Sequence, residues 1–277
     1  MMTTMTHWQT TRYRVDLTRP RVMGIVNVTP DSFSDGGRLG IDAIRHCEQL
    51  VAEGADMLDI GGESTRPGSQ AITVEEELGR VLPVLEAALT LGVPISIDTK
   101  KADVMREVLA RGADIVNDID ALQAPGTLDA VAAYPSCGIC LMHMRGDPLT
   151  MQHRPRYDDV VTEVREFLAG RLHALQNRRV AAGRIVLDPG IGFGKSVEHN
   201  LELLRRQREL LALGQPLLVG WSRKSTLGAI TGRDVSERLA ASLAAALTAV
   251  QGGASVLRVH DVAATVDALK VWGAAHG

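Results

Sequence analysis

VMGIVNVTPDSFSDGG, residues 22–37, joins a run of apolar residues to a long polar segment. The run from Val22 to Val26 has the composition of a parallel β-strand that is buried on both faces. Asn27 stands where such a strand would emerge, and a loop rich in Ser, Asp and Gly follows it. The same order of apolar run, polar tip, loop and helix recurs along the chain. This recurrence predicts both the fold and the place where functional groups gather.

Three segments share one template: GADMLD (54–59), GADIVN (112–117) and GASVLR (253–258). Each glycine follows a helical pattern, as is typical of the residue that ends a helix in the left-handed conformation. A short strand follows each glycine, with a polar residue five positions after it. The template therefore marks the joint of a repeated strand–helix unit.

Eight short apolar runs are predicted strands, and helical patterns fill the intervals between them. The strands are expected near residues 22–28, 56–60, 94–98, 114–117, 138–142, 184–188, 216–220 and 255–259. The helices are expected near residues 41–53, 74–90, 101–111, 126–134, 158–181, 198–212, 224–250 (with a break around Gly232) and 262–274. Strands that alternate with helices form a parallel sheet, and eight such units predict an α/β protein with a closed (β/α)₈ TIM barrel.

Residues 1–20 are predicted to form an N-terminal strand or hairpin extension, in which Tyr13 to Leu17 is a strand that caps the bottom of the barrel. An open doubly wound sheet is the alternative fold. It would require a G-x-G-x-x-G fingerprint after the first strand, and none stands there. No linker-like stretch divides the chain, so residues 1–277 are expected to form a single domain.

Composition argues against several classes of function. A net charge of −3 and only three Trp, three Tyr and three Phe make a nucleic-acid partner a poor interpretation. The N-terminus has no apolar core of signal-peptide length, and no stretch approaches the roughly 20 apolar residues of a membrane span. We therefore expect a soluble cytoplasmic protein with no membrane partner. Cys137 and Cys140 lie in one apolar run, from Cys137 to Leu141, and in a strand an offset of three sends two side chains to opposite faces, so they are interpreted as buried thiols.

Active sites of such barrels lie at the C-terminal ends of the strands, where the polar residues fall into two chemical sets. Carboxylates, an amide and a cation suit a flat heterocycle with a hydrogen-bonding edge, and this set comprises Asp98, Asn117, Asp188 and Lys224. The second set suits an anion such as a phosphate, and it comprises Asn27, Thr65, Arg66, Arg258 and His260. For its two arginines, a salt bridge to Glu63 or Asp261 is the alternative explanation.

Residues 190–196, GIGFGKS, follow a predicted strand and end in Gly-Lys-Ser, as a nucleotide-binding P-loop does. That motif needs a glycine five residues before Gly194, and Pro189 occupies the position. The segment is instead interpreted as a turn that exposes its backbone beside a ligand ring, with Phe193 as an apolar wall. Two other loops, residues 28–40 and 61–73, are longer than a barrel requires and are expected to act as lids.

Eight segments carry a further signal: MGIVNVTPDSFSDGG (23–37), DIGGESTRPGS (59–69), ISIDT (95–99), IVNDI (115–119), LMHMRGDPLTMQ (141–152), LDPGIGFGKS (187–196), LVGWSRKSTLG (218–228) and LRVHDV (257–262). In this order they resemble the bacterial dihydropteroate synthase family, from about residue 20 to the end of the chain. The resemblance implies a TIM barrel and a transferase that joins p-aminobenzoate to 6-hydroxymethyl-7,8-dihydropterin diphosphate. Diphosphate would leave and 7,8-dihydropteroate would form, which is a step of folate biosynthesis.

The resemblance also implies roles for individual residues. The pterin would be held by Asp98, Asn117, Met142, Asp188, Phe193, Gly220 and Lys224. The diphosphate would be held by Asn27, Thr65, Arg66, Arg258 and His260, with Mg²⁺ bridging its oxygens near Asn27. The p-aminobenzoate pocket, where sulfonamides would compete, would be shaped by Phe33, Pro67 and Ser222. Asp98, Lys224 and Arg258 are the predicted catalytic residues of a dissociative displacement that needs no protein nucleophile.

Some questions remain open at the level of sequence. Trp221 is bulkier than the residue more usual in the family and would change p-aminobenzoate affinity only if it points into the pocket. A methyltetrahydrofolate–corrinoid methyltransferase and a non-catalytic pterin-binding paralogue are the rival functions, although the former would leave Arg66 and Arg258 without a purpose. The family is commonly homodimeric, and the alanine-rich stretch 239–250 is either an interface or a helix face buried on the barrel.

Overall fold

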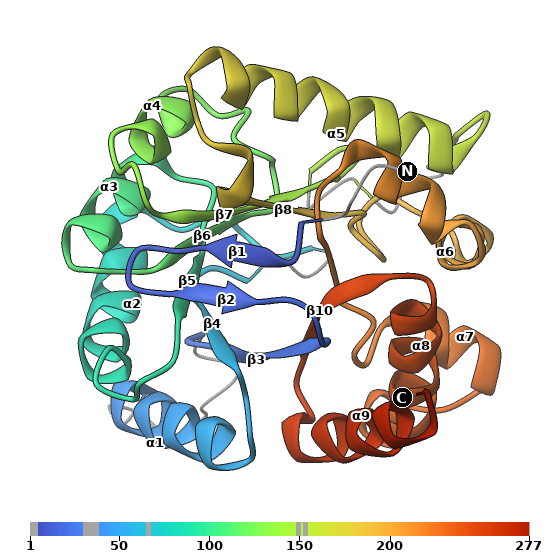
Figure 1. Cartoon of the computed structure of the whole chain (residues 1–277). Coiled ribbons are helices and arrows are strands. Elements are labelled where there is room, and N and C mark those ends of the chain that lie inside the picture. Colours follow the sequence, from blue (N-terminus) through green and yellow to red (C-terminus); the bar gives the residue numbers. More distant parts are fainter. Residues whose placement is uncertain (1–4, 30–38, 65–67, 148–150, 152–154, 277) are drawn as a thin grey trace.

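The computed structural model describes residues 5–29, 39–64, 68–147, 151 and 155–276 (Figure 1). Within these residues, eight parallel strands pair in the closed order β10-β3-β4-β5-β6-β7-β8-β9. Their bounds are β3 (Arg21–Asn27), β4 (Met57–Gly61), β5 (Ile95–Asp98), β6 (Ile115–Asp118), β7 (Gly138–Met142), β8 (Ile185–Asp188), β9 (Leu217–Val219) and β10 (Ala254–Val259). The closed ring confirms the predicted TIM barrel and shows that the doubly wound alternative is wrong.

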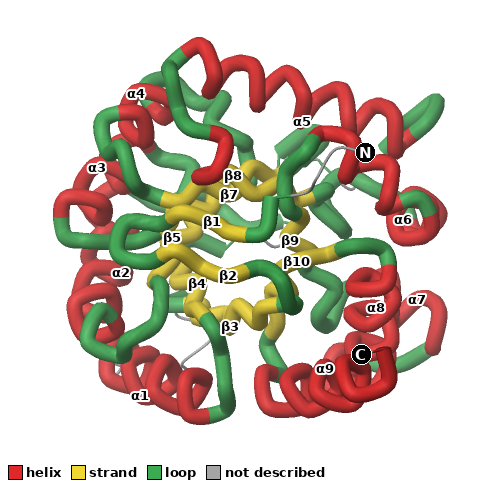
Figure 2. Tube along the Cα trace, in the orientation of Figure 1, coloured by secondary structure: helices red, strands yellow, loops and turns green. Residues whose placement is uncertain are grey.

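Helices surround the ring of strands, as Figure 2 shows. The α-helices are α1 (Leu39–Ala52), α2 (Val74–Ala88), α3 (Ala102–Ala110), α4 (Thr127–Ala132), α5 (Val160–Asn177), α6 (Val197–Arg205), α7 (Ser225–Thr231), α8 (Leu239–Gln251) and α9 (Val262–His276). Short 3₁₀ helices are η1 (Ala182–Arg184), η2 (Gln207–Leu213) and η3 (Val235–Glu237). The helix expected at 198–212 is therefore divided between α6 and η2. The expected break around Gly232 is confirmed, because this residue ends α7 with a φ of 70°.

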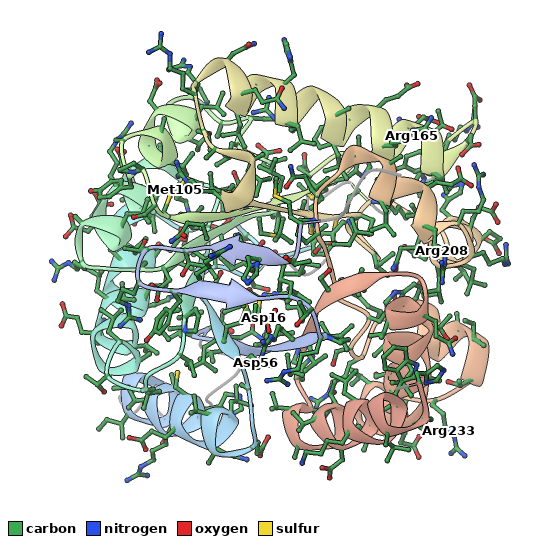
Figure 3. The ribbon with its side chains drawn as sticks, in the orientation of Figure 1. Asp16, Asp56, Met105, Arg165, Arg208 and Arg233 are labelled. Atoms are coloured by element: carbon green, nitrogen blue, oxygen red, sulfur yellow. The ribbon has the colours of Figure 1, made fainter. Side chains whose placement is uncertain are left out.

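An antiparallel hairpin precedes the barrel and confirms the predicted N-terminal extension. It pairs β1 (His7–Gln9) with β2 (Arg14–Asp16), and Figure 1 shows it lying across one end of the ring. Trp8 is fully buried, and its indole Nε1 donates a hydrogen bond to the carbonyl oxygen of Arg184, 2.9 Å away at the end of η1, directly before β8. The hairpin therefore closes the N-terminal end of the barrel. On this face, where Figure 3 labels Asp16 and Asp56, Arg21 Nη1 lies 2.9 Å from Asp56 Oδ1.

The apolar core forms two layers, one inside the barrel and one between the strands and the helices. The inner cluster contains Trp8, Leu17, Met23, Met57, Ile115, Cys140, Val186, Leu218 and Val256. Cys137 lies instead in the outer cluster, and both thiols are buried and free. This confirms that the offset of three separates the two cysteines. With its N-terminal end filled and capped, the barrel leaves the opposite end of its strands for polar chemistry.

Helix α8 has one face on the barrel and one face outside it. Ser242, Ala245, Ala246, Ala249 and Val250 are buried, whereas Leu239 is 42% exposed. Packing against the rest of the protein therefore accounts for five of the twelve residues of the alanine-rich stretch 239–250. Among the described residues, none of the helices combines the length and hydropathy needed to cross a membrane.

Candidate active site

A cavity of about 760 Å³ lies at the C-terminal ends of the barrel strands. Every predicted site residue that the structure describes lines it: Asn27, Asp98, Asn117, Met142, Asp188, Phe193, Gly220, Ser222, Lys224, Arg258 and His260. They come from strand ends and from the loops that follow, as the barrel topology requires. Phe33, Thr65, Arg66 and Pro67 lie outside the described residues, so their roles stay predictions.

Three strands meet beside this cavity through one buried carboxylate, Asp59 on β4. Its Oδ2 atom accepts hydrogen bonds from Arg258 Nε at 2.6 Å and from Asn117 Nδ2 at 3.0 Å. Arg258 also donates from Nη2 to Asp98 Oδ2 at 2.9 Å. Asp59 is fully buried and does not line the cavity, whereas its three neighbours do. Asp59 therefore orients groups that a ligand would contact without being one of them.

The sequence contained a signal for this arrangement. Asp59, Asn117 and Arg258 are the polar residues that stand five positions after the glycine of each template segment. The template places them at equivalent heights on β4, β6 and β10, and there their side chains meet. Arg258 pairs with Asp59 and Asp98, so the expected alternative, a salt bridge to Asp261, is wrong. Asp261 pairs instead with Arg223.

Burial changes the protonation of the groups around the cavity. It raises the pKa of Asp98 to about 7, and the nearby Arg258 opposes that increase. It also raises the pKa of Asp188 and lowers that of Lys224 to about 8, the latter against the attraction of Asp188. Asp98 can therefore gain or lose a proton near neutral pH, as can Lys224 slightly above it, which is common at catalytic sites.

The turn after β8 and the segment after β9 form one wall of the cavity. Lys224 Nζ lies 4.2 Å from the centroid of the Phe193 ring, so the ammonium lies over an aromatic face. Gly192 brings its backbone close to the same lysine, because a Cβ atom there would lie 3.1 Å from Lys224 Cδ. This wall combines an apolar surface with a cation, and both suit the flat heterocycle expected from the sequence.

Ser222 and His260 form a second polar wall. The Ser222 hydroxyl accepts a hydrogen bond from the His260 backbone N–H at 3.1 Å and lies 3.0 Å from His260 Nδ1. Burial, together with Arg258 and Arg223, lowers the pKa of His260 to about 3, so the imidazole is neutral at physiological pH. When the hydroxyl donates to Nδ1, the ring carries its hydrogen on Nε2. The Ser222 hydroxyl is thus engaged with His260, and any contact to p-aminobenzoate would share it.

The cavity also contains residues that sequence reasoning did not select. These are Ile25, Ile119, Met151, Ile191, Arg223, Ser225, Val235 and Arg238. The apolar members gave no signal because their side chains carry no charge and no hydrogen-bonding group that would mark them as candidates. Arg223 and Ser225 flank the selected Lys224, and Arg223 has a φ of 58° that the sequence did not reveal. Trp221 is 2% exposed and packs in the outer apolar layer, so it points away from the cavity.

Beside the cavity, Lys101 joins two carboxylates. Its Nζ contacts Glu77 Oε2 at 2.5 Å and also contacts Glu63 Oε2, which accepts a hydrogen bond from the Ile72 backbone N–H at 3.1 Å. Glu77 is 1% exposed, and its Oε1 has no hydrogen-bond partner in the part of the chain that the structure describes. The cluster holds together Glu63 and Ile72, which flank residues 65–67 in the chain.

The described residues contain no group of three or more His, Cys, Asp or Glu side chains that could hold a metal ion. A metal ion bound to this part of the chain would therefore have few protein ligands. Asn27 lies at the end of β3 and lines the cavity. Mg²⁺ characteristically keeps several waters and binds through one or two protein oxygens together with substrate phosphates. A single carboxamide oxygen at the cavity fits that mode, whereas a cage made only of protein ligands does not.

Comparisons with known proteins agree with this site. A family model described as "Pterin binding enzyme" matches residues 23–260. A dihydropteroate synthase from Neisseria meningitidis serogroup B is 51% identical over 275 residues, which cover 96% of each protein. The solved structure of Xanthomonas albilineans dihydropteroate synthase with 4-aminobenzoic acid has a TM-score of 0.93 and 51% identity, covering 99% of both chains. The Burkholderia cenocepacia enzyme complexed with 7,8-dihydropteroate has a TM-score of 0.90 and 50% identity, covering 99% of this chain and 98% of that one.

Proposed function

Because the chain belongs to the dihydropteroate synthase family, whose members are transferases of folate biosynthesis, we propose that its cavity joins p-aminobenzoate to 6-hydroxymethyl-7,8-dihydropterin diphosphate by a dissociative displacement. The observation that carries the proposal is the convergence of Asp98, Asn117, Asp188, Lys224 and Arg258 on one cavity. We place the whole reaction in a single domain formed by residues 1–277.

The pterin end of the proposed site is the part next to Asp59. Asn117 offers a donor and an acceptor, and the carboxylates of Asp98 and Asp188 accept hydrogen bonds from ring nitrogens and amino groups. Phe193 and Met142 supply apolar surface for the faces of the ring, and Gly220 leaves room beside them. The mixture matches a flat heterocycle that presents donors and acceptors along its edge.

The diphosphate end is proposed to combine Arg258, His260 and Asn27 with Thr65 and Arg66. A guanidinium holds phosphate oxygens through paired hydrogen bonds, and the neutral His260 donates one more from Nε2. Mg²⁺ would be held by Asn27 together with the diphosphate oxygens, and there it would stabilise negative charge on the leaving group.

The reaction would begin with cleavage of the C–O bond between the pterin methylene and the diphosphate. The electron pair leaves with the diphosphate, whose growing charge is stabilised by Arg258 and His260. The carboxylate of Asp98 stabilises the electron-poor methylene. The arylamine nitrogen then forms the C–N bond and loses one proton, which the diphosphate accepts. Such a route needs no protein nucleophile. Arylamine would enter beside Ser222, with Phe33 and Pro67 as further walls, and sulfonamides would compete for that space.

Two further properties belong to the proposal. We place the protein in the cytoplasm. We also propose a homodimer, because apolar side chains are exposed on neighbouring elements of one flank: Ile230 of α7, Val235 of η3, Leu239 of α8 and Val271 of α9. Sedimentation of the chain as a monomer at micromolar concentration would rule out the dimer.

The decisive experiment measures diphosphate release and dihydropteroate formation from dihydropterin diphosphate and Mg²⁺, with and without p-aminobenzoate. We expect dihydropteroate only when the arylamine is present, and an Arg258→Ala variant should lose most of the rate. Pterin binding without product would contradict the proposal and favour a non-catalytic paralogue. Methyl transfer to a corrinoid under the same conditions would favour the methyltransferase instead.

A further inference from the structure

A buried ammonium group lies behind the wall that carries Phe193. Lys195 is 3% exposed and does not line the cavity. Its Nζ lies 2.9 Å from the carbonyl oxygen of Gly190, 3.0 Å from that of Phe193 and 2.8 Å from His143 Nδ1. It thus contacts the two ends of one turn and a side chain of the neighbouring loop. Lys195 thus lies outside the cavity lining, in agreement with the sequence interpretation of residues 190–196 as a turn and not as a P-loop.

The next residue also serves the local structure. Ser196 is the N-cap of α6, since its hydroxyl accepts a hydrogen bond from the His199 backbone N–H at 3.2 Å. The Gly-Lys-Ser sequence therefore starts a helix and points its lysine back into the preceding turn. The amino group of Lys195 donates hydrogen bonds to the carbonyl oxygens of Gly190 and Phe193, which both point toward one buried point.

The turn has little freedom on its other side. It presses against the loop after β7, because a Cβ atom at Gly190 would lie 1.8 Å from the His143 carbonyl oxygen. A Cβ atom at Gly194 would lie 2.2 Å from the Arg145 carbonyl oxygen, and both glycines have positive φ. Tyr157 adds a hydrogen bond of 2.9 Å from its hydroxyl to the Gly194 carbonyl oxygen. The position of the turn is thus set by the loop after β7, and Lys195 joins the two from within.

We propose that Lys195 is a positioning residue for pterin binding, whose ammonium ties the turn after β8 to His143 and so fixes Phe193 and Gly192 in the cavity wall. This role rests on the proposed function, because Phe193 is expected to contact the pterin. The link continues to Lys224, whose Nζ lies 4.2 Å from the Phe193 ring centroid. If the turn lost its contacts with Lys195, Phe193 would change position, and Lys224, which lies over its ring, would change position with it.

The charged groups around Lys195 allow a second readout. Burial lowers the pKa of Lys195 well below its usual value; the charge of Asp188 opposes this decrease, and the charges of Lys224 and Arg145 add to it. His143 is neutral, because burial lowers its pKa to about 2. Burial raises the pKa of Asp188, and the positive charge of Lys195 is one of the influences that oppose this increase. Replacing Lys195 with an uncharged residue should therefore raise the pKa of Asp188 further. The acid limb of pterin binding should move to higher pH, which a purely mechanical loss of stability would not cause.

The test compares Lys195→Met with Tyr157→Phe, which removes a single hydrogen bond to the same turn and no charge. Calorimetry with dihydropterin diphosphate gives the affinity, and steady-state kinetics give the two KM values. For Lys195→Met we expect the dissociation constant and KM of the pterin substrate to rise at least about tenfold, while KM for p-aminobenzoate changes less than about threefold. Tyr157→Phe should stay within about twofold of the parent for both substrates.

Two outcomes would overturn the positioning role. One is a folded Lys195→Met protein with parental pterin affinity, and the other is an equal rise in both KM values. Should Lys195→Met not fold, His143→Leu decides, because it removes one of four contacts of the Lys195 amino group. The contacts to the carbonyl oxygens of Gly190, Phe193 and residue 143 itself, the last at 3.3 Å, stay in place. A selective loss of pterin affinity in this variant supports the role, and unchanged affinity refutes it. Calorimetry reads pterin binding even if the parent forms no dihydropteroate, so the failure of each proposal can be told apart.

Discussion

The strongest prediction concerns Asp59, because one carboxylate oxygen orients two residues of the cavity wall. We consider the replacement Asp59→Asn, which keeps the shape of the side chain and removes its charge. The new amide can place its oxygen where Oδ2 now accepts from Arg258 Nε and Asn117 Nδ2. Its NH₂ group would then occupy the position of Oδ1, which has no hydrogen-bond partner among the described residues. Both hydrogen bonds are therefore retained, and what is lost is the negative charge of their common acceptor, which attracts the Arg258 guanidinium.

The magnitude follows from that difference. A hydrogen bond to a charged group contributes about 1.5–3 kcal/mol, roughly twice the contribution of a neutral one. Arg258 keeps its second partner, Asp98, at 2.9 Å, so the loss should lie near ~1.5 kcal/mol. If Arg258 stabilises the leaving diphosphate, this corresponds to a fall of about tenfold in kcat/KM. Asp59→Ala leaves Arg258 Nε and Asn117 Nδ2 without this acceptor and should lower kcat/KM further.

The same replacement should move the pH profile in a defined direction. The negative charge of Asp59 is one of the influences that raise the pKa of Asp98, after burial and against Arg258. Removing that charge lowers the pKa of Asp98, so the ionised carboxylate should persist to lower pH. The acid limb of kcat/KM for dihydropterin diphosphate is therefore expected to shift downward.

Ser96→Ala provides the matched control for this measurement. Ser96 pairs with Asp59 in register on β5, is fully buried, and has a hydroxyl with no partner in the described part of the chain. Its loss should leave kcat/KM and the acid limb unchanged. The reasoning fails if Asp59→Asn retains parental kcat/KM with an unshifted acid limb, or if Ser96→Ala produces the same changes.

Three further predictions concern the pH dependence of activity, the ion cluster at Lys101 and the buried Trp221. The pH profile of kcat/KM should be bell-shaped, with activity rising as Asp98 ionises near pH 7 and falling as Lys224 loses its proton near pH 8. An Asp98→Asn variant should lose the part of the acid limb that Asp98 sets and keep the part that Asp188 sets. Lys101→Met should lower the free energy of unfolding, measured in urea, by ~3–5 kcal/mol, because it leaves the buried Glu77 carboxylate without its cation. The double variant Lys101→Met/Glu77→Leu should recover most of this loss. Trp221→Phe should change neither KM by more than about twofold, because the indole faces the outer apolar layer; a larger change in KM for p-aminobenzoate would place it at the pocket after all.

The barrel itself was predictable because its signals are local. Each apolar run of four to seven residues reports a buried parallel strand, and the glycine of each template segment reports the end of a helix before it. Element boundaries were less accurate where the signal depends on distant contacts. Periodicity alone did not predict the end of α6 at Arg205, where the chain changes to a 3₁₀ helix. Nor did periodicity reveal β1, because its Trp8 is held by a distant contact, the hydrogen bond to the Arg184 carbonyl oxygen directly before β8.

The site was predictable to the extent that its residues stand at strand ends. Topology then brings them to one rim, whatever the chemistry of each side chain. Asp59 was not selected because it stands two residues before the end of β4, where a strand residue is expected to serve the core. Its importance comes from β6 and β10, which supply the donors to its carboxylate. A local pattern does not encode a contact between strands so far apart in sequence. The signal for this contact was instead the position that Asp59, Asn117 and Arg258 share in the repeated template.

A common feature of Asp59 and Lys195 explains how the barrel can hold a charged, precisely shaped site at the end of an apolar core. Each is a buried ionisable group that lies outside the cavity lining and is held by polar partners. Asp59 is held by the guanidinium of Arg258 on another strand, and Lys195 by the carbonyl oxygens of the turn that precedes it. Burying such ions is costly unless every partner is in place, so each is compatible with only one arrangement of the surrounding loops. We therefore expect Asp59→Asn and Lys195→Met to affect opposite walls of the cavity independently. Their effects on the affinity for dihydropterin diphosphate should add to within about 0.5 kcal/mol in the double variant. A larger coupling energy would mean that the two ions hold one connected structure, and that the pterin pocket is a single cooperative unit instead of two separately supported walls.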